Sequence, residues 1–224
     1  MPYNGLKAIG LALVAILLCS QGSAAQQPAK HWLIGWWQGD LQPPAGPTPV
    51  RIITVTSVAK DGTARGNMGL PGQNLGPAEI KVDGSKVHVV NAFKSVGEFT
   101  REGDDRLVGT VTAKDAKTGS RLALTRVKLA EDHALVGEWM GTWQRPSFND
   151  NGQFYLTIIG VNGANVVGEY RWSGRAMTKE SGFVGTLSGD ALAFGTIKLS
   201  VNDKQMTGVG SDGQSSSNVS LMKK

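Results

Sequence analysis

Apolar and polar residues alternate with a period of two in short segments along most of this chain. Clear examples are residues 50–58, 78–82 and 154–159, which precede Asp-Gly or Asn-Gly dipeptides at 61–62, 83–84 and 162–163. A period of two is typical of strands with one buried face, and these dipeptides supply the positive φ that tight hairpins need. We therefore expect an antiparallel meander of β-strands.

Helical periodicity is weak by comparison. The chain contains 30 glycines and 9 prolines, and we predict a helix-like segment only in the linker at residues 129–133. A helical or α/β protein would show longer segments with a period near 3.6 residues. The pattern therefore indicates an all-β fold.

One sequence motif occurs twice with the same internal spacing. The first copy is Gly35, Trp37, Gly39 and Gln42, and the second is Gly137, Trp139, Gly141 and Gln144. Weaker similarity reaches the ends of both copies, where Ser120, Leu122, Leu124 and Arg126 correspond to Ser217, Val219, Leu221 and Lys223. Matches in the same order, with small changes of spacing, indicate a duplicated structural unit.

The turn signals divide each repeat into about eight strands, which is close to the number that closes a small barrel around its own side chains. We therefore predict two tandem antiparallel up-and-down β-barrels of about eight strands each, one over residues 26–130 and the other over residues 131–224. In each opening strand a tryptophan lies between two glycines. We expect these residues, Trp37 and Trp139, to be buried plugs of the two barrels.

The opening pattern Gly-x-Trp-x-Gly, followed by a meander whose last strand ends in a basic residue such as Arg126 or Lys223, resembles the calycin-type barrels of lipocalins and avidins. The second repeat is the more similar, through residues 168–170 and 185–194. The chain departs from avidins at Gly141 and Thr142, where their opening strand continues with polar biotin contacts. The resemblance therefore implies the barrel and not the binding of biotin.

Residues 1–25 have the pattern of a secretory signal peptide, with Lys7 before an apolar segment at 8–18 and small residues at 23–25. The apolar segment is shorter than the roughly 20 residues of a transmembrane helix. Cys19 is the only cysteine, so the mature chain is expected to contain no disulfide. This combination favours a periplasmic or secreted bacterial protein without a transmembrane segment.

The formal net charge is +5, and the excess of lysine and arginine lies in the first repeat. Because the basic residues form no consecutive run, we interpret them as solvated strand faces and expect no specific nucleic-acid partner.

Residues for catalysis are scarce. His31, His88 and His133 lie far apart without the spacing of a metal site, and no Gly-x-Ser-x-Gly motif or mature cysteine is present. We expect no catalytic residue, metal or cofactor, although a barrel enzyme of isomerase or cyclase type remains a third alternative.

Aromatic residues are the better candidates for a site. We select as candidate ligand-binding residues Trp36, Trp143, Tyr155, Tyr170, Arg171 and Trp172. Tyr170 and Trp172 share one face of their strand, so they either fill the barrel or form an aromatic-lined mouth. Trp36 alternates with Trp37 and should point outward, where it either contacts a ligand or lies between the two repeats.

The sequence leaves two functions open. One is an exported, non-enzymatic binding protein that holds a small apolar molecule or a glycan in or on a barrel. The alternative is an interaction or inhibitor module that contacts an envelope or secreted protein through its loops. The interior volume of the barrels distinguishes the two functions, because large core residues such as Leu156, Phe194 and Leu221 would leave no space for a ligand.

Overall fold

The computed structural model describes residues 31–174, 178–211 and 215–224, so the predicted signal peptide at residues 1–25 lies outside the described residues. The strands of the first half are β1 (Gly35–Gln42), β2 (Val50–Val58), β3 (Thr63–Gly69), β4 (Gly76–Asp83), β5 (Lys86–Asn91), β6 (Val96–Arg101), β7 (Arg106–Thr112) and β8 (Ser120–Val127). The strands of the second half are β9 (Gly137–Arg145), β10 (Asp150–Asn162), β11 (Asn165–Gly174), β12 (Thr178–Ser188), β13 (Ala191–Phe194), β14 (Ile197–Asn202), β15 (Gln205–Ser211) and β16 (Ser216–Lys223).

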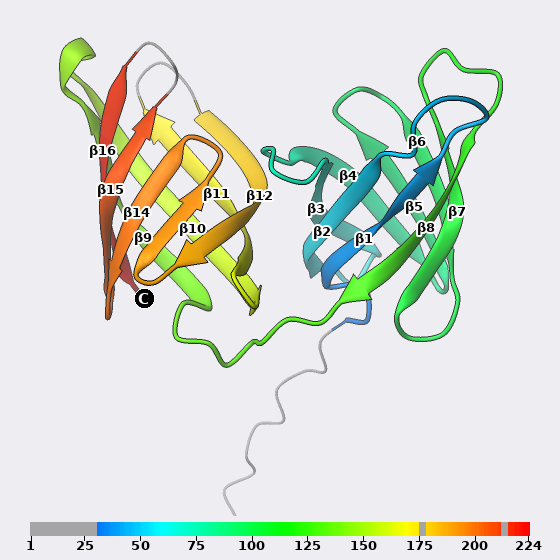
Figure 1. The fold of residues 1–224 in the computed structure, drawn as a ribbon, viewed down its shortest axis with the longest axis horizontal. Helices are drawn as coiled ribbons and strands as arrows, with labels where there is room; N and C mark the ends of the chain where they lie inside the picture. Colours follow the sequence, from blue (N-terminus) through cyan, green and yellow to red (C-terminus); the bar gives the residue numbers. More distant parts are fainter. Residues whose placement is uncertain (1–30, 175–177, 212–214) are drawn as a thin grey trace, which may run out of the picture. The chain divides into compact units, whose positions relative to one another are not determined.

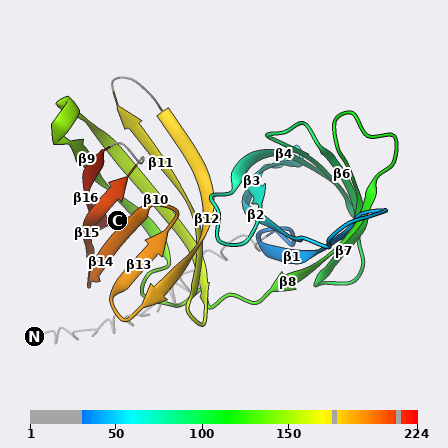
Figure 2. The ribbon, with the colours of Figure 1, turned by 45° about the horizontal axis from the view of Figure 1, so that its top comes forward.

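Each half forms a closed barrel of antiparallel strands (Figure 1). In the first barrel every strand pairs with its neighbour in sequence, and β1 pairs with β8 to close the ring (Figure 2). The second barrel repeats this order and closes through β9 and β16. The prediction of two tandem eight-stranded up-and-down barrels is therefore confirmed.

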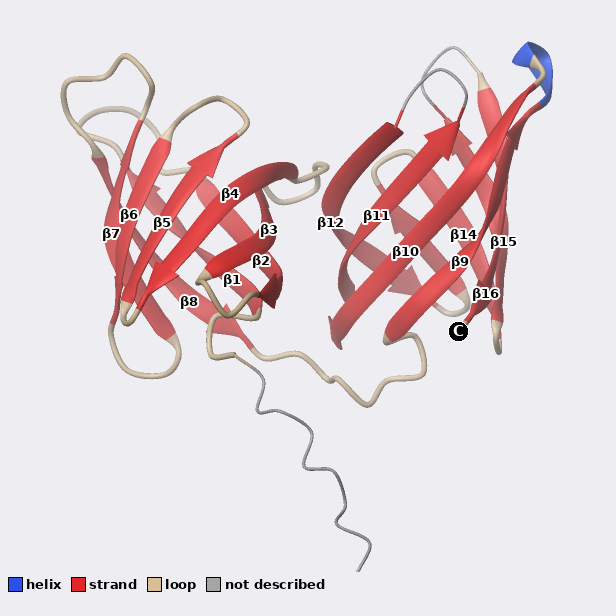
Figure 3. Cartoon of the chain, turned by 180° about the vertical axis from the view of Figure 1, so that it is seen from behind, coloured by secondary structure: helices blue, strands red, loops and turns tan. Residues whose placement is uncertain are grey.

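The linker between the barrels differs from its prediction. Residues 129–133 form no helix, because Ala130 instead pairs with Val161 of β10 through two backbone hydrogen bonds of 2.7 and 3.1 Å. Within the described residues the one helix is a 3-10 turn at Pro146–Phe148, between β9 and β10 (Figure 3).

Side chains from all strands fill both barrels. Trp37 and Trp139 are 0% and 1% exposed, and the Nε1 groups donate to the backbone oxygens of Leu33 at 2.8 Å and Leu135 at 2.9 Å. Each tryptophan thereby fastens the segment that precedes its strand to the barrel interior. Their predicted burial is confirmed.

The repeats also share irregular backbone features. Gly35 and Gly137 both have positive φ, at 142° and 127°. A register shift lies between Val55 and Ser57 in the first barrel and between Ile158 and Gly160 in the second. Bulges at equivalent places bend the long strands, as closure of a small barrel requires.

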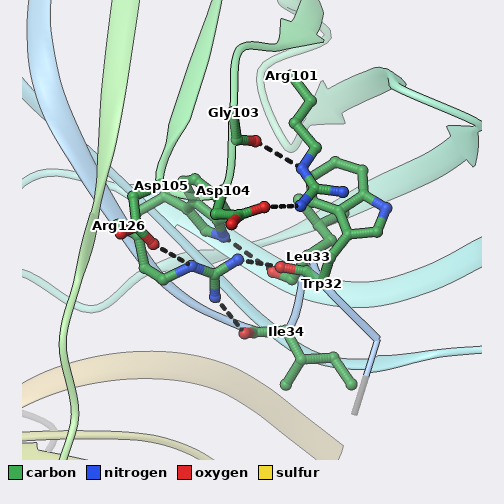
Figure 4. Close-up of polar contacts among 9 residues, drawn as sticks. Trp32, Leu33, Ile34, Arg101, Gly103, Asp104, Asp105 and Arg126 are labelled. Carbon is green, nitrogen blue, oxygen red and sulfur yellow. Dashed lines mark hydrogen bonds and ion pairs between the residues drawn. The ribbon is translucent and has the colours of Figure 1, made fainter. Parts of the chain in front are cut away.

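A basic residue of the last strand covers the tryptophan in each barrel. The Arg126 guanidinium lies 4.2 Å from the Trp37 ring centroid and donates to the backbone oxygens of Trp32 and Ile34 (Figure 4). Its Nε lies 3.2 Å from Asp105 Oδ1. In the second barrel Lys223 takes this position, 5.6 Å from the Trp139 ring centroid, and donates to the Ala134 oxygen.

The two barrels contact each other within the unit that spans His31–Lys224. Leu75, which follows β3, forms an isolated β-bridge with Gly182 of β12, with hydrogen bonds of 2.8 and 3.0 Å. A small apolar cluster beside this bridge contains Trp36, Ile52, Leu75 and Val167. A side chain at position 182 would overlap Asn67, because its Cβ would lie 2.6 Å from the Asn67 Cβ. Glycine is therefore needed for this close approach.

Candidate functional site

Three of the candidate ligand-binding residues lie inside the second barrel. Trp143, Tyr170 and Trp172 are buried together with Phe154, whose ring stacks on Tyr170 with centroids 5.8 Å apart and planes 7° apart. Burial raises the pKa of the Tyr170 hydroxyl, so it remains neutral and protonated. These rings fill the barrel, as one of the two sequence-based interpretations expected.

The two buried indoles lie toward the end of the barrel where β9 and β11 finish. Their ring centroids are 5.7 Å apart. Trp143 Nε1 donates to the Ser173 oxygen at 3.2 Å, whereas Trp172 Nε1 has no hydrogen-bond partner within the described residues. Lys179 Nζ lies 5.8 Å from the Trp172 ring centroid. A buried donor without a partner is uncommon, so among the described interior side chains Trp172 has a donor left to offer a ligand.

Trp36 does not join these aromatic residues. It points out of the first barrel, as predicted, and is 5% exposed because it packs against Ile52, Leu75 and Val167 between the barrels. Its Nε1 also lacks a hydrogen-bond partner in the described part of the chain. The structure therefore places Trp36 in the contact between barrels.

Tyr155 and Arg171 come together on the outer face of the second barrel. They are direct partners in the pairing of β10 with β11, and the Arg171 guanidinium carbon lies 4.6 Å from the Tyr155 ring centroid. Beside them is a pocket of about 330 Å³. Its lining includes Arg65, Glu138, Tyr155, Thr157, Glu169, Arg171 and Lys224.

Most charges at this pocket are already paired. Arg65 Nε lies 3.3 Å from Glu169 Oε1, and Arg65 also bonds to Glu180. Lys224 Nζ lies 3.1 Å from Glu138 Oε2. Arg171 has no carboxylate partner among the described residues, so its guanidinium is the cation available to a ligand.

Glu169 is the most buried carboxylate of this group, with 12% of its side chain exposed. Burial raises the pKa of Glu169 above its ordinary value, and the nearby Arg65 guanidinium opposes the shift. Thr56 Oγ1 also donates to Glu169 Oε2 at 3.2 Å. This carboxylate thereby joins β11 of the second barrel to β2 and β3 of the first.

Two methionines that the sequence analysis did not select extend this outer face. Met140 of β9 is the direct partner of Tyr155, and Met222 of β16 is the direct partner of Met140. They are 40% and 54% exposed. The alternation of Met140 with the buried Trp139 indicated that Met140 points outward. The pairing of the first strand with the last was needed to bring Met222 beside it.

A second depression lies on the outer face of the first barrel. It has a volume of about 730 Å³ and is lined mainly by residues of β3, β4 and β5, with Ser57 of β2, Ala59 and, from the second barrel, Glu180 of β12. Its charged side chains include the positive Arg65 and Lys81 and the negative Glu79 and Glu180. Because the two signs balance, the groove favours no particular ligand charge.

The histidines have structural partners. The Nδ1 atoms of His31 and His133 accept hydrogen bonds of 3.2 Å from the backbone N–H groups of Leu33 and Leu135. His88 Nδ1 lies 2.6 Å from Glu98 Oε1 on the exposed face of β5 and β6. Among the described residues no group of three or more His, Cys, Asp or Glu side chains is placed to hold a metal ion. The same part of the chain contains no helix long and apolar enough to span a membrane.

Comparison with solved structures gives distant likenesses to several chains. No family model and no curated protein matches the chain. A solved structure of a DUF3598-family protein of unknown function from Nostoc punctiforme is similar at 14% sequence identity, with a TM-score of 0.26. The match covers 86% of this chain and 97% of that chain. This likeness is too weak to support an argument about function.

Proposed function

We propose that this protein is an exported, non-enzymatic binding protein in which both barrels serve as scaffolds and the ligand or partner binds on an outer face. The observation that carries the proposal is where space remains in the molecule. Large side chains such as Trp37, Trp139 and Phe154 fill the barrel interiors, whereas the 330 Å³ and 730 Å³ depressions lie on outer strand faces.

The outer face around Tyr155 and Arg171 is the best supported location. It combines an aromatic ring, a cation without a carboxylate partner among the described residues and an adjoining pocket. Binding sites commonly combine apolar surface with a few well-placed polar groups. Filled barrels also favour the interaction alternative, in which the partner is an envelope or secreted protein, over an enclosed apolar molecule.

Chemical-shift mapping by NMR tests this proposal. A panel of soluble glycans, phospholipid vesicles and peptides would be titrated into the folded protein. We expect a binding member to shift backbone signals of Tyr155 and Arg171 while the methyl signals of Leu156 and Leu221 stay unchanged. A ligand that shifts the interior methyl groups first would contradict external binding, and a panel without any binding member would contradict the proposal as a whole.

A small ligand at the end of the second barrel is the second candidate, and the unpaired Nε1 of Trp172 favours it. Such a ligand would need an acceptor atom for this donor and a surface that stacks on Trp143. Replacement of Trp172 by phenylalanine removes the donor and keeps an aromatic ring. We expect ligand binding at this end to weaken in Trp172→Phe, with no effect on binding at Arg171.

A further inference from the structure

Four residues form a continuous row across the outer face of the second barrel. In order they are Met222 of β16, Met140 of β9, Tyr155 of β10 and Arg171 of β11, and each is the direct cross-strand partner of the next. We call this set the methionine row. Adjacent strands lie about 4.8 Å apart, so the row spans about 14 Å.

The neighbouring rows give the methionine row two different edges. On one side lie Ser220, Thr142, Gln153 and Ser173, which are uncharged. On the other side Glu138, Thr157 and Glu169 follow one another, and both carboxylates are paired with a cation. The row is therefore an apolar strip that leads to the Arg171 guanidinium. The next residue across the sheet, Glu180 of β12, is itself paired with Arg65.

We infer that the methionine row is the docking surface for a protein partner that places apolar side chains over Met140 and Met222 and a carboxylate against Arg171. This inference rests on the proposed function, because it assigns a partner class to the same outer face.

The shape and composition of the row favour a protein over a small molecule. The two methionines are about half exposed on a strand surface, and a small ligand needs a concave site that covers most of its surface. Methionine, tyrosine and arginine are among the residues enriched in protein–protein interfaces. The flexible thioether side chain also adapts to the shape of a partner.

The first barrel already uses the equivalent strand face for packing against protein. Ile52 is the direct partner of Gln38, as Tyr155 is of Met140, and Gln38 also pairs with Thr125. Ile52 is buried in the contact with Val167 of the second barrel. The position equivalent to Tyr155 therefore contacts the second barrel in the first repeat, whereas Gln38 and Thr125 remain partly or fully exposed.

The carboxylate follows from charge complementarity. Arg171 is held over Tyr155 by the cation–π contact and has no carboxylate partner within the described residues. A guanidinium presents a planar fork that matches a carboxylate in a bidentate arrangement. A partner with an acidic side chain beside apolar residues therefore satisfies both ends of the row.

Selection from a random peptide library displayed on phage tests this inference with the folded protein as bait. We expect the selected peptides to contain Asp or Glu within a few residues of apolar side chains. Binding of one such synthetic peptide should weaken at least tenfold in Met140→Lys. Arg171→Glu should abolish its binding and, as bait, should select peptides with Lys or Arg in place of the acid. Val209→Lys is the matched control, since Val209 is 46% exposed on β15 of the same barrel, and it should bind as the wild type does.

Two results would overturn the inference. One is a selected peptide that binds Met140→Lys and Arg171→Glu as tightly as the wild-type protein, which would leave external binding intact but place it elsewhere. The other is a library that yields no specific binder to the wild type. If the glycans and vesicles of the NMR titration also fail to bind, the proposed function is contradicted as well.

Discussion

Replacement of Trp139 by alanine tests how the second barrel is stabilised. The indole is 1% exposed, and its Nε1 donates to the Leu135 oxygen at 2.9 Å. Lys223 lies above the ring and donates to the Ala134 oxygen. The substitution therefore removes the largest interior side chain at this end of the barrel and releases the segment that precedes β9.

The expected loss of stability is large. Truncation of a buried tryptophan to alanine costs about 3–5 kcal/mol, and loss of the donor to a buried carbonyl costs about 1–3 kcal/mol. Because these contributions overlap, we expect a total of about 4–6 kcal/mol. A domain of this size has a stability of about 5–15 kcal/mol, so the second barrel should be unfolded or close to it.

Hydrogen exchange measured by mass spectrometry resolves the two barrels separately. In Trp139→Ala we expect protection to be lost throughout β9–β16 and retained in β1–β8. Residues of the contact between barrels, such as Leu75 and Trp36, should exchange faster because they lose their partner surface. Urea denaturation followed by circular dichroism should show a separate early transition for the second barrel.

Trp139→Phe is the matched control, because it keeps an aromatic ring and removes the N–H donor. We expect it to cost less than Trp139→Ala and to leave the second barrel folded. The reasoning would be refuted if Trp139→Ala retained normal protection in β9–β16. It would also be refuted if β1–β8 unfolded together with them, since each barrel would then lack a stable core of its own.

Three further predictions concern the contact between the barrels and the closed ends. Trp36→Ala should leave both barrels folded and increase hydrogen exchange only along their contact, because Trp36 lies outside both interiors. Glu169→Gln should reduce the pH dependence of stability. Burial raises the folded-state pKa of Glu169. The stabilising contribution of its protonated carboxyl group is therefore fully present below the unfolded-state pKa and is lost as the pH rises through the folded-state pKa. The stability of wild type relative to Glu169→Gln, measured by urea denaturation, should therefore increase as the pH falls from neutral through the glutamate range, and an opposite slope would contradict this. Arg126→Ala should cost more than Lys223→Ala in thermal unfolding, by about 1–3 kcal/mol, because it leaves one more backbone oxygen without its donor.

Local sequence patterns were sufficient to predict the barrels. Alternation and turn dipeptides determine where strands begin and end, and the duplicated motif locates Trp37 and Trp139 at equivalent interior positions. The one wrong element was the helix-like linker at 129–133. There Ala130 pairs with Val161, which lies about 30 residues further along the chain, and a local pattern contains no information about such pairing.

The candidate site was only partly predictable for the same reason. Alternation separated the inward Tyr170 and Trp172 from the outward Arg171, but it did not show which aromatic residues would share a surface. Met140 and Met222 become neighbours through the closure of β9 on β16, at opposite ends of the repeat. The contact of Trp36 with the second barrel depends on the bridge between Leu75 and Gly182, which no periodicity encodes.

Comparison of the two repeats separates residues that maintain the fold from residues that are free to serve a function. Trp37 and Trp139 keep the same hydrogen bond, and Arg126 and Lys223 keep the same place above them. Both barrels need these contacts, so duplication preserved them. In contrast, Met140 faces solvent where the first repeat has Gln38, although exposed apolar surface brings no stability to an isolated barrel. Contiguous exposed apolar residues indicate an interaction surface more strongly than a single one does. Because Met140 adjoins Met222 and Tyr155 across neighbouring strands, this argument leads to the outer face of the second barrel.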